Sequence, residues 1–192
     1  TNFTYPVHVM KVYNEAMESF MDTEGLIIDL RGNTGGLGDM IGWMAGWLIA
    51  EKDQSLGTMP MRDLELRFVV CPRPRTDPGP VAVLVDGLSA SASELFASGK
   101  QELGRARVVG SRTAGASLPA QTLILPNGDG LIYPTSLHVT ESGKMIEGVG
   151  VIPDVEVPLT RADLLAGRDR ALETAIDWIR NQVPTNLKEA RE

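Results

Sequence analysis

The feature that most constrains the fold is an uninterrupted apolar run, Val81-Ala82-Val83-Leu84-Val85, which leads directly into small residues from Asp86 to Glu94. A strand with one face in water alternates apolar and polar residues, whereas a continuous apolar run indicates a strand buried on both faces. Such strands lie in parallel sheets that have helices on both sides. We therefore expect an α/β protein in which this strand ends at a tight turn and a helix begins near Ser91.

Hydrophobic periodicity and turn residues predict the other elements. Their expected order is a helix over 10–20, a strand over 25–31, a helix ending near 50, an extended segment over 57–71, the strand over 81–86, a helix over 91–103, a strand over 107–110, a hairpin over 123–133, a strand over 136–140 and a helix over 160–181. The apolar side of the last helix carries Leu164, Leu165, Leu172, Ala175, Ile176 and Ile179. Strands that alternate with helices predict right-handed crossovers, and the hairpin adds antiparallel pairing. The expected fold class is α/β, a layered mixed sheet with flanking helices.

Glycines recur every four residues in the helix expected before residue 50, at Gly38, Gly42 and Gly46. Glycine costs about 1 kcal/mol per helical site relative to alanine, so this smooth stripe predicts close packing against a neighbouring segment. The single Cys71 closes an apolar stretch, which favours a core thiol over a reactive one. The proline-rich stretch 72–80 predicts a loop, because proline can continue neither a helix nor a central strand.

Length and composition limit the classes of protein. A chain of 192 residues with 43% hydrophobic residues fits one globular domain, which we place over residues 1–192. The net charge of −7 and the lack of a basic face argue against nucleic acid as a partner. The apolar stretch 40–50 is too short to cross a bilayer, so no membrane span is expected. The first residue is Thr1 rather than methionine, and we expect a domain excised from a longer chain.

Ser91 is the candidate nucleophile on local sequence alone. A turn between a buried strand and a helix is where α/β proteins hold reactive groups, and free N–H groups at a helix N-terminus favour negative charge. The same residues also fit a capping box, in which the Ser91 hydroxyl caps the helix and Glu94 reaches back. A hydroxyl bonded to its own helix is not free to attack, so the sequence leaves two competing interpretations open.

The stretch Gly32-Asn33-Thr34-Gly35-Gly36 follows the strand expected over 25–31. It lacks the pattern of a phosphate-binding loop. An ordinary strand-to-helix turn is one interpretation. The other is an oxyanion hole, in which the N–H of Gly35 or Gly36 and the N–H of Ala92 bind developing negative charge.

Taken in order, several stretches resemble the carboxyl-terminal processing, or tail-specific, serine proteases. Residues 26–36 are similar to the family's Asp-Leu-Arg-x-Asn-x-Gly-Gly segment, 83–94 resemble its nucleophile turn, and 104–110 and 148–154 match two further stretches. The resemblance implies a fold related to the crotonase and Clp-type protease cores, peptide-bond hydrolysis with Ser91 as nucleophile, and no metal or cofactor. It also implies a polypeptide substrate, bound as an added strand at a sheet edge, and a periplasmic or other extracytoplasmic bacterial location, and it allows a homo-oligomer.

The chain departs from the family pattern in two places. Many members carry a general-base lysine in a Phe-Gly-Lys-Gly turn, but Ala116 stands at that position here and cannot take a proton. Whether this alanine is natural or engineered stays open. Glu147 stands where lysine-type members carry glutamine, which resembles the tricorn-like branch with its serine, histidine and glutamate. Glu147 is therefore the candidate carboxylate that orients a histidine, with a solvated loop carboxylate as the alternative.

The general base itself is missing from the pattern. His8 opens the first helix, His138 is expected on the surface of the strand over 136–140, and Lys100 lies about two and a half helical turns beyond Ser91. The resemblance implies a histidine from sequence outside this chain or from another chain. Relatives often carry a PDZ domain, and none is recognised here. A non-catalytic relative that binds peptides or hydrophobic ligands is the alternative function. An acyl-CoA enzyme is a third possibility, against which the lack of a basic cluster for the CoA phosphates counts.

Overall fold

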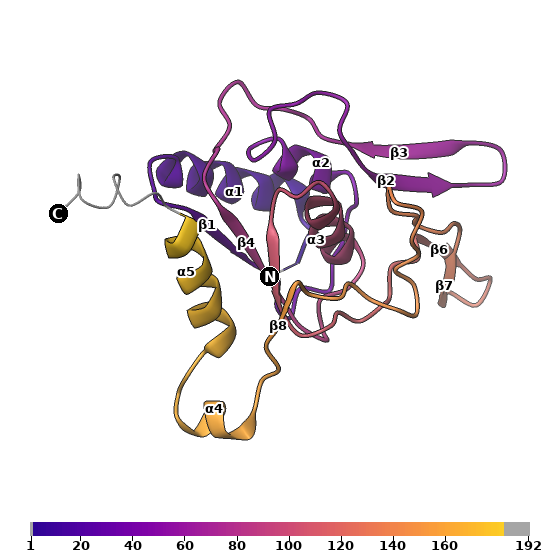
Figure 1. Ribbon diagram of the computed structural model, residues 1–192. Coiled ribbons are helices and arrows are strands. Elements are labelled where there is room, and N and C mark those ends of the chain that lie inside the picture. The colour runs from indigo at the N-terminus through magenta and orange to yellow at the C-terminus, as the bar shows by residue number, and fades with distance from the viewer. Residues whose placement is uncertain (1, 183–192) are drawn as a thin grey trace.

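A parallel sheet of four strands forms the centre of the computed structural model, which describes residues 2–182 (Figure 1). Its strand order is β1-β4-β5-β8, and every neighbouring pair is parallel. The strands are β1 (Leu26–Asp29), β4 (Val81–Val85), β5 (Arg107–Gly110) and β8 (Val155–Glu156). The apolar run Val81–Val85 is the inner strand β4, and all of its residues are 0% exposed. The layered α/β fold expected from the sequence is confirmed.

Helices cover both faces of this sheet (Figure 1). Alternate residues of β4 point to opposite faces: Val83 belongs to the larger apolar cluster, and Leu84 to the smaller one. The larger cluster contains residues of α1 (Pro6–Phe20), α2 (Met40–Ala45) and α3 (Ala92–Glu102). The smaller cluster is closed by α5 (Arg170–Gln182). Burial on both faces explains why the β4 sequence shows no alternation.

Antiparallel pairing occurs in two separate hairpins, β2 (Ser55–Pro60) with β3 (Glu65–Val69), and β6 (Ala120–Ile124) with β7 (Gly130–Pro134). Both lie on the side of the molecule away from α5 (Figure 1). The second is the hairpin that Asn127-Gly128 predicts, with Leu123 opposite Leu131. Neither hairpin joins the four-stranded sheet, so the antiparallel strands remain outside it.

The glycine stripe packs as tightly as its spacing predicts. A Cβ atom at Gly42 would lie 2.3 Å from the carbonyl oxygen of Val69, and one at Gly46 would lie 1.7 Å from that of Cys71. The segment after β3 therefore runs directly over these glycines. The helix is shorter than expected, because α2 ends at Ala45 and tighter turns carry the chain on. Cys71 is half-buried at this contact rather than enclosed in the core.

The strand expected over 136–140 is absent, and His138 is buried at 1% exposure rather than lying on the surface. This segment makes only isolated bridges, in which Val139 pairs with Thr58 and with Met145. The register of β2 against β3 shifts between Ser55 and Thr58, next to this bridge. The imidazole of His138 fills the space that Gly57 leaves open, since a Cβ there would lie 2.5 Å from Nε2.

The helix expected over 160–181 is two helices, α4 (Arg161–Leu165) and α5. Gly167 adopts a left-handed φ of 63° that ends α4, and Asp169 caps α5 by accepting a hydrogen bond from the N–H of Leu172. Leu164 and Leu165, expected on the apolar side, are exposed, whereas the apolar side of α5 is buried as predicted. Among residues 2–182, no helix is both long enough and apolar enough to cross a membrane.

Candidate active site

Ser91 lies at the strained turn between β4 and α3. Its φ is 54°, a left-handed value that side chains rarely adopt. The Asp86 carboxylate stabilises this turn by accepting hydrogen bonds from the N–H groups of Leu88 and Ser89, each at 3.0 Å. The same carboxylate oxygen accepts from the N–H of Gly32 at 3.0 Å, which ties this turn to the loop after β1. A sharp strand-to-helix turn of this kind exposes the hydroxyl of a nucleophilic serine.

Ser91 and Glu94 occupy the two positions of a capping box, and the glutamate half is formed: Oε2 accepts from the Ser91 N–H at 3.0 Å. The Glu94 N–H donates to the Ser91 carbonyl oxygen at 2.8 Å. The Ser91 hydroxyl makes no capping hydrogen bond of good geometry. Both halves of the capping box suggested by the sequence are therefore in position, with the Ser91 side chain facing the Glu94 N–H without forming a full hydrogen bond.

Glu94 is a buried hub rather than a surface cap. Its side chain is 0% exposed, and its carboxylate accepts four hydrogen bonds. The donors are the N–H of Ser91, the hydroxyl of Thr113 (2.6 Å), and the N–H groups of Gly115 (2.7 Å) and Ala116 (3.0 Å). The sequence indicates only a helix cap for Glu94. The signal for more was an acidic residue in the first turn of a helix whose neighbours are all small or apolar.

The glycine loop lies directly against the Ser91 turn. A Cβ atom at Gly35 would lie 2.7 Å from the Ala92 nitrogen and 2.8 Å from the Ser91 Cβ, so only glycine fits there. The N–H of Gly35 is already donated to the Asn33 side chain at 2.9 Å. Within residues 2–182, the N–H groups of Gly36 and Ala92 donate to no hydrogen-bond partner. Gly36 and Ala92 are therefore the two predicted donors that remain available to a ligand.

An ion-pair network holds the start of this loop. The Arg31 guanidinium donates to both carboxylate oxygens of Asp29 (3.0 and 2.7 Å) and to both of Asp169 (2.8 Å each). The hydrogen bonds that Arg31 donates to Asp29, followed by those to Asp169, raise the Arg31 pKa above its usual value. Asp169 also caps α5. Arg31 therefore connects the end of β1 to α5, the helix on the face of the sheet opposite α1, α2 and α3.

Glu147 lies beside the segment that contacts Ser91. Its Oε2 atom accepts hydrogen bonds from the N–H groups of Ser117 (2.7 Å) and Leu118 (3.1 Å). The preceding residue, Ala116, accepts the Ser91 N–H through its carbonyl oxygen at 3.0 Å. The residue is half-buried, and its other carboxylate oxygen, Oε1, has no hydrogen-bond partner in the described chain. Glu147 therefore has one oxygen anchored and one available close to the Ser91 turn.

Neither histidine contacts Ser91 in the part of the chain that the structure describes. His8 is exposed in the first turn of α1. His138 packs against Phe68, with ring centroids 5.9 Å apart, and both of its nitrogens are buried without a hydrogen-bond partner. Burial lowers the His138 pKa. Lys100 is also buried, with Nζ 3.2 Å from the centre of the Phe96 ring, so it does not serve Ser91.

Comparison with known proteins identifies the family of the chain. The pattern of peptidase family S41 matches residues 2–157. A carboxy-terminal-processing protease of Bartonella bacilliformis is 31% identical over 150 residues, covering 78% of this chain and 34% of that protein. The chain spans about a third of the length of the curated relatives it matches.

Solved structures show the same fold. A putative peptidase from Parabacteroides merdae is 27% identical with a TM-score of 0.73, covering 87% of this chain and 56% of that one. The tricorn protease is 24% identical with a TM-score of 0.70, covering 94% of this chain and 17% of that one, and it supports the fold alone. With most of its residues matched to a single family, this chain belongs to peptidase family S41.

Proposed function

We propose that this chain is the core of a serine peptidase that hydrolyses peptide bonds, with Ser91 as the nucleophile. The observation that carries the proposal is the Ser91 turn: a strained φ of 54° and a serine side chain that makes no full hydrogen bond to its own helix. The N–H groups of Ala92, the next residue, and of Gly36, which follows the glycine packed against this turn, have no partners in the described residues. The family match and the carboxyl-terminal-processing relatives support the same reaction class.

In this mechanism the Ser91 oxygen attacks the carbonyl carbon of the substrate and its proton passes to a base. The oxygen of the tetrahedral intermediate accepts hydrogen bonds from Ala92 and Gly36, and each such donor contributes about 2.7–4 kcal/mol of transition-state stabilisation. The intermediate collapses to an acyl-enzyme, and the base returns the proton to the departing amine. Water then hydrolyses the acyl-enzyme by the same route. The N–H of Gly35 takes no part, because Asn33 already accepts it.

The base in this proposal is a histidine from outside residues 2–182 or from another chain, oriented by the free oxygen of Glu147. The anchoring of Glu147 beside Ala116 supports that role. Ala116 cannot act as a base, and the histidines within the described residues lie away from Ser91. A carboxylate that holds one imidazole nitrogen sets the tautomer that accepts the serine proton.

The substrate in this proposal is an extended polypeptide that adds a strand to β6. Within the described residues β6 pairs only with β7, so its other edge is open, and every residue of the hairpin is exposed. β6 begins two residues after Leu118, which donates to Glu147, so a strand on this edge lies close to Ser91. Leu123 and Ile124, 51% and 67% exposed, offer apolar contacts to alternate side chains of the substrate.

The test uses the protein at its full natural length and an unfolded polypeptide substrate. Ser91→Ala abolishes hydrolysis in this account, whereas the matched control Ser93→Ala retains it. Ser93 is a suitable control because its hydroxyl is buried and has no hydrogen-bond partner. Hydrolysis that survives Ser91→Ala, with the same products, refutes the proposed nucleophile.

A non-catalytic peptide-binding relative is the second candidate, and Ala116 at the lysine position favours it. This alternative predicts that the full-length protein binds an extended peptide at the β6 edge but never cleaves it. Binding with unchanged affinity in Ser91→Ala, together with no detectable hydrolysis by the unaltered protein, supports this candidate over the peptidase.

A further inference from the structure

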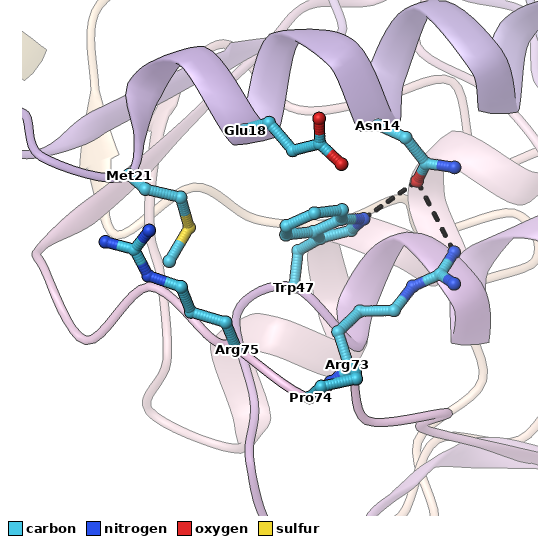
Figure 2. Close-up of a pocket in the computed structure, with 7 residues that line it drawn as sticks. All are labelled: Asn14, Glu18, Met21, Trp47, Arg73, Pro74 and Arg75. Atoms are coloured by element: carbon cyan, nitrogen blue, oxygen red, sulfur yellow. Dashed lines mark hydrogen bonds between the residues drawn. The ribbon is translucent and has the colours of Figure 1, made fainter.

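A cavity lies at the opposite end of the sheet from Ser91. It has a volume of about 420 Å³ and is lined by Asn14, Glu18, Met21, Trp47, Arg73, Pro74 and Arg75 (Figure 2). Met21 follows α1 and precedes the amino end of β1, whereas Ser91 follows the carboxyl end of the parallel strand β4. The cavity therefore lies outside the proposed peptidase site, and no step of the proposed reaction uses it.

Trp47 provides the apolar floor of the cavity and is held in a fixed orientation. The indole is 9% exposed, and its Nε1–H donates to the Asn14 Oδ1 at 2.8 Å. The same oxygen accepts from Arg73 Nη2 at 3.4 Å, as the dashed lines in Figure 2 show. Asn14 thus positions both the ring and the guanidinium, so this part of the cavity is formed before any ligand arrives.

The proline-rich loop supplies a cation that has no counter-ion. Among residues 2–182, no carboxylate lies within 4.0 Å of Arg73, and its Nε atom is buried without a hydrogen-bond partner. The Arg73 guanidinium carbon lies 5.4 Å from the Trp43 ring centre and 5.8 Å from that of Trp47. The Arg73 N–H donates to the Gly46 carbonyl at 2.9 Å, so the glycine stripe fixes this wall. A planar guanidinium held in this way is suited to binding a carboxylate through two hydrogen bonds.

The α1 side of the cavity carries the opposite charge. Glu18 is one helical turn beyond Asn14, and its carboxylate lies over the indole in Figure 2. Glu18 forms no ion pair with any described residue, whereas Arg75 on the far side is paired with Asp22 at 3.0 Å. An ammonium group between a carboxylate and the face of an indole gains both a charge-assisted hydrogen bond and a cation–π contact.

Opposite charges on separate walls, with an apolar floor between them, fit a small zwitterion. We propose that this cavity binds a free α-amino acid with an apolar side chain. The ligand carboxylate contacts Arg73, its ammonium group contacts Glu18, and its side chain packs on Trp47 and Met21. The volume lies within the range of about 300–1,000 Å³ that is usual for small-molecule sites.

The test is a titration of the full chain with L-leucine and L-phenylalanine, followed by the indole N–H resonances in nuclear magnetic resonance spectra. The Trp47 resonance shifts saturably, and the Trp178 resonance on α5 stays in place as an internal control. Acetyl-leucine and leucine amide each lack one charge, and each binds about tenfold or more weakly, because each loses one charge-assisted contact. Binding of either blocked compound as tightly as the free amino acid overturns the proposal.

Variants separate this site from a non-specific apolar surface. Glu18→Gln weakens binding of the free amino acid by about tenfold and leaves the affinity for acetyl-leucine, which has no ammonium group, unchanged. Glu15→Gln on the same helix is the matched control, because Glu15 lies 4.0 Å from Lys11 and does not line the cavity. Arg73→Lys keeps the charge but removes the two-bond geometry, and it weakens binding as well. No shift of the Trp47 resonance at about 10 mM ligand, or equal binding by Glu18→Gln and the unaltered chain, refutes the assignment.

Discussion

Replacing Glu94 by glutamine tests whether one buried carboxylate holds the Ser91 turn in place. Each Glu94 oxygen accepts two hydrogen bonds: Oε1 from Thr113 and Gly115, and Oε2 from Ser91 and Ala116. Glutamine keeps one acceptor oxygen and presents an NH₂ group at the other position. In the better orientation the NH₂ group faces Thr113, whose oxygen also accepts the Val151 N–H, so the Thr113 O–H and the Gly115 N–H lose their acceptor.

The cost follows from these contacts. A buried donor left without an acceptor costs about 1–3 kcal/mol. The remaining bonds change from charge-assisted to neutral, which removes roughly 1 kcal/mol from each. Because an uncharged amide is easier to bury than a carboxylate, part of this loss is recovered. We expect Glu94→Gln to lower the free energy of unfolding by about 2–4 kcal/mol, a large part of the ~5–15 kcal/mol typical of a domain.

The measurement is urea unfolding of the two proteins, followed by circular dichroism. Glu102→Gln is the matched control on the same helix, since Glu102 is half-buried and accepts from Thr140 and Ser142 at the surface. We expect the control to change stability by less than about 1 kcal/mol. A Glu94→Gln protein within about 0.5 kcal/mol of the unaltered one refutes the reasoning, because the four hydrogen bonds would then contribute little.

Two further substitutions test other parts of the account. Burial, followed by the nearby Arg105, lowers the Lys100 pKa in the folded chain well below 10.5. Between the folded and the unfolded pKa of Lys100, the unfolded chain binds more protons than the folded one, so stability rises with pH across that window. Lys100→Met therefore raises the free energy of unfolding at neutral pH by about 1 kcal/mol or more, and this difference between variant and unaltered chain shrinks towards pH 10.5. A variant that is less stable at pH 7 shows instead that the contact of Nζ with the Phe96 ring outweighs desolvation. Gly46→Ala drives a methyl group into the Cys71 carbonyl oxygen and destabilises the chain by about 1–3 kcal/mol in thermal unfolding. The control Gly38→Ala has a smaller effect, because its methyl group meets only the Phe68 ring at 3.1 Å. Equal effects of the two substitutions contradict the packing described for the stripe.

The sequence predicted those parts of the fold whose residues carry a local signal. The apolar run of β4 specified a buried parallel strand, and Asn127-Gly128 specified a hairpin turn. The spacing of Gly42 and Gly46 predicted a close approach, although not which segment approaches. Each of these signals lies within a few residues of the element that it predicts.

Predictions failed where a distant contact decides the conformation. The surface position expected for His138 was wrong because Gly57, far away in the sequence, opens a space that the imidazole fills. The break between α4 and α5 depends on Gly167 and on Asp169, whose carboxylate also binds Arg31 across 138 positions of sequence. The buried role of Glu94 depends on the loop over 113–116, which no helical pattern reveals.

The candidate site was predicted in part. Ser91 and Ala92 lie at one turn, Gly36 follows the glycine packed against it, and Glu147 binds the segment that accepts the Ser91 N–H. Their chemical roles stay predictions until they are tested. Gly35 has a steric function that the sequence could not separate from hydrogen-bond donation, because only the structure shows that Asn33 accepts its N–H.

The most direct test of the account is covalent labelling of the full-length protein with a fluorophosphonate, with the modified residue located by mass spectrometry. The account predicts one adduct, on the Ser91 oxygen, that is lost in Ser91→Ala and kept in Ser93→Ala. An adduct on another serine, or a folded protein that cleaves peptides while Ser91 stays unlabelled, contradicts it.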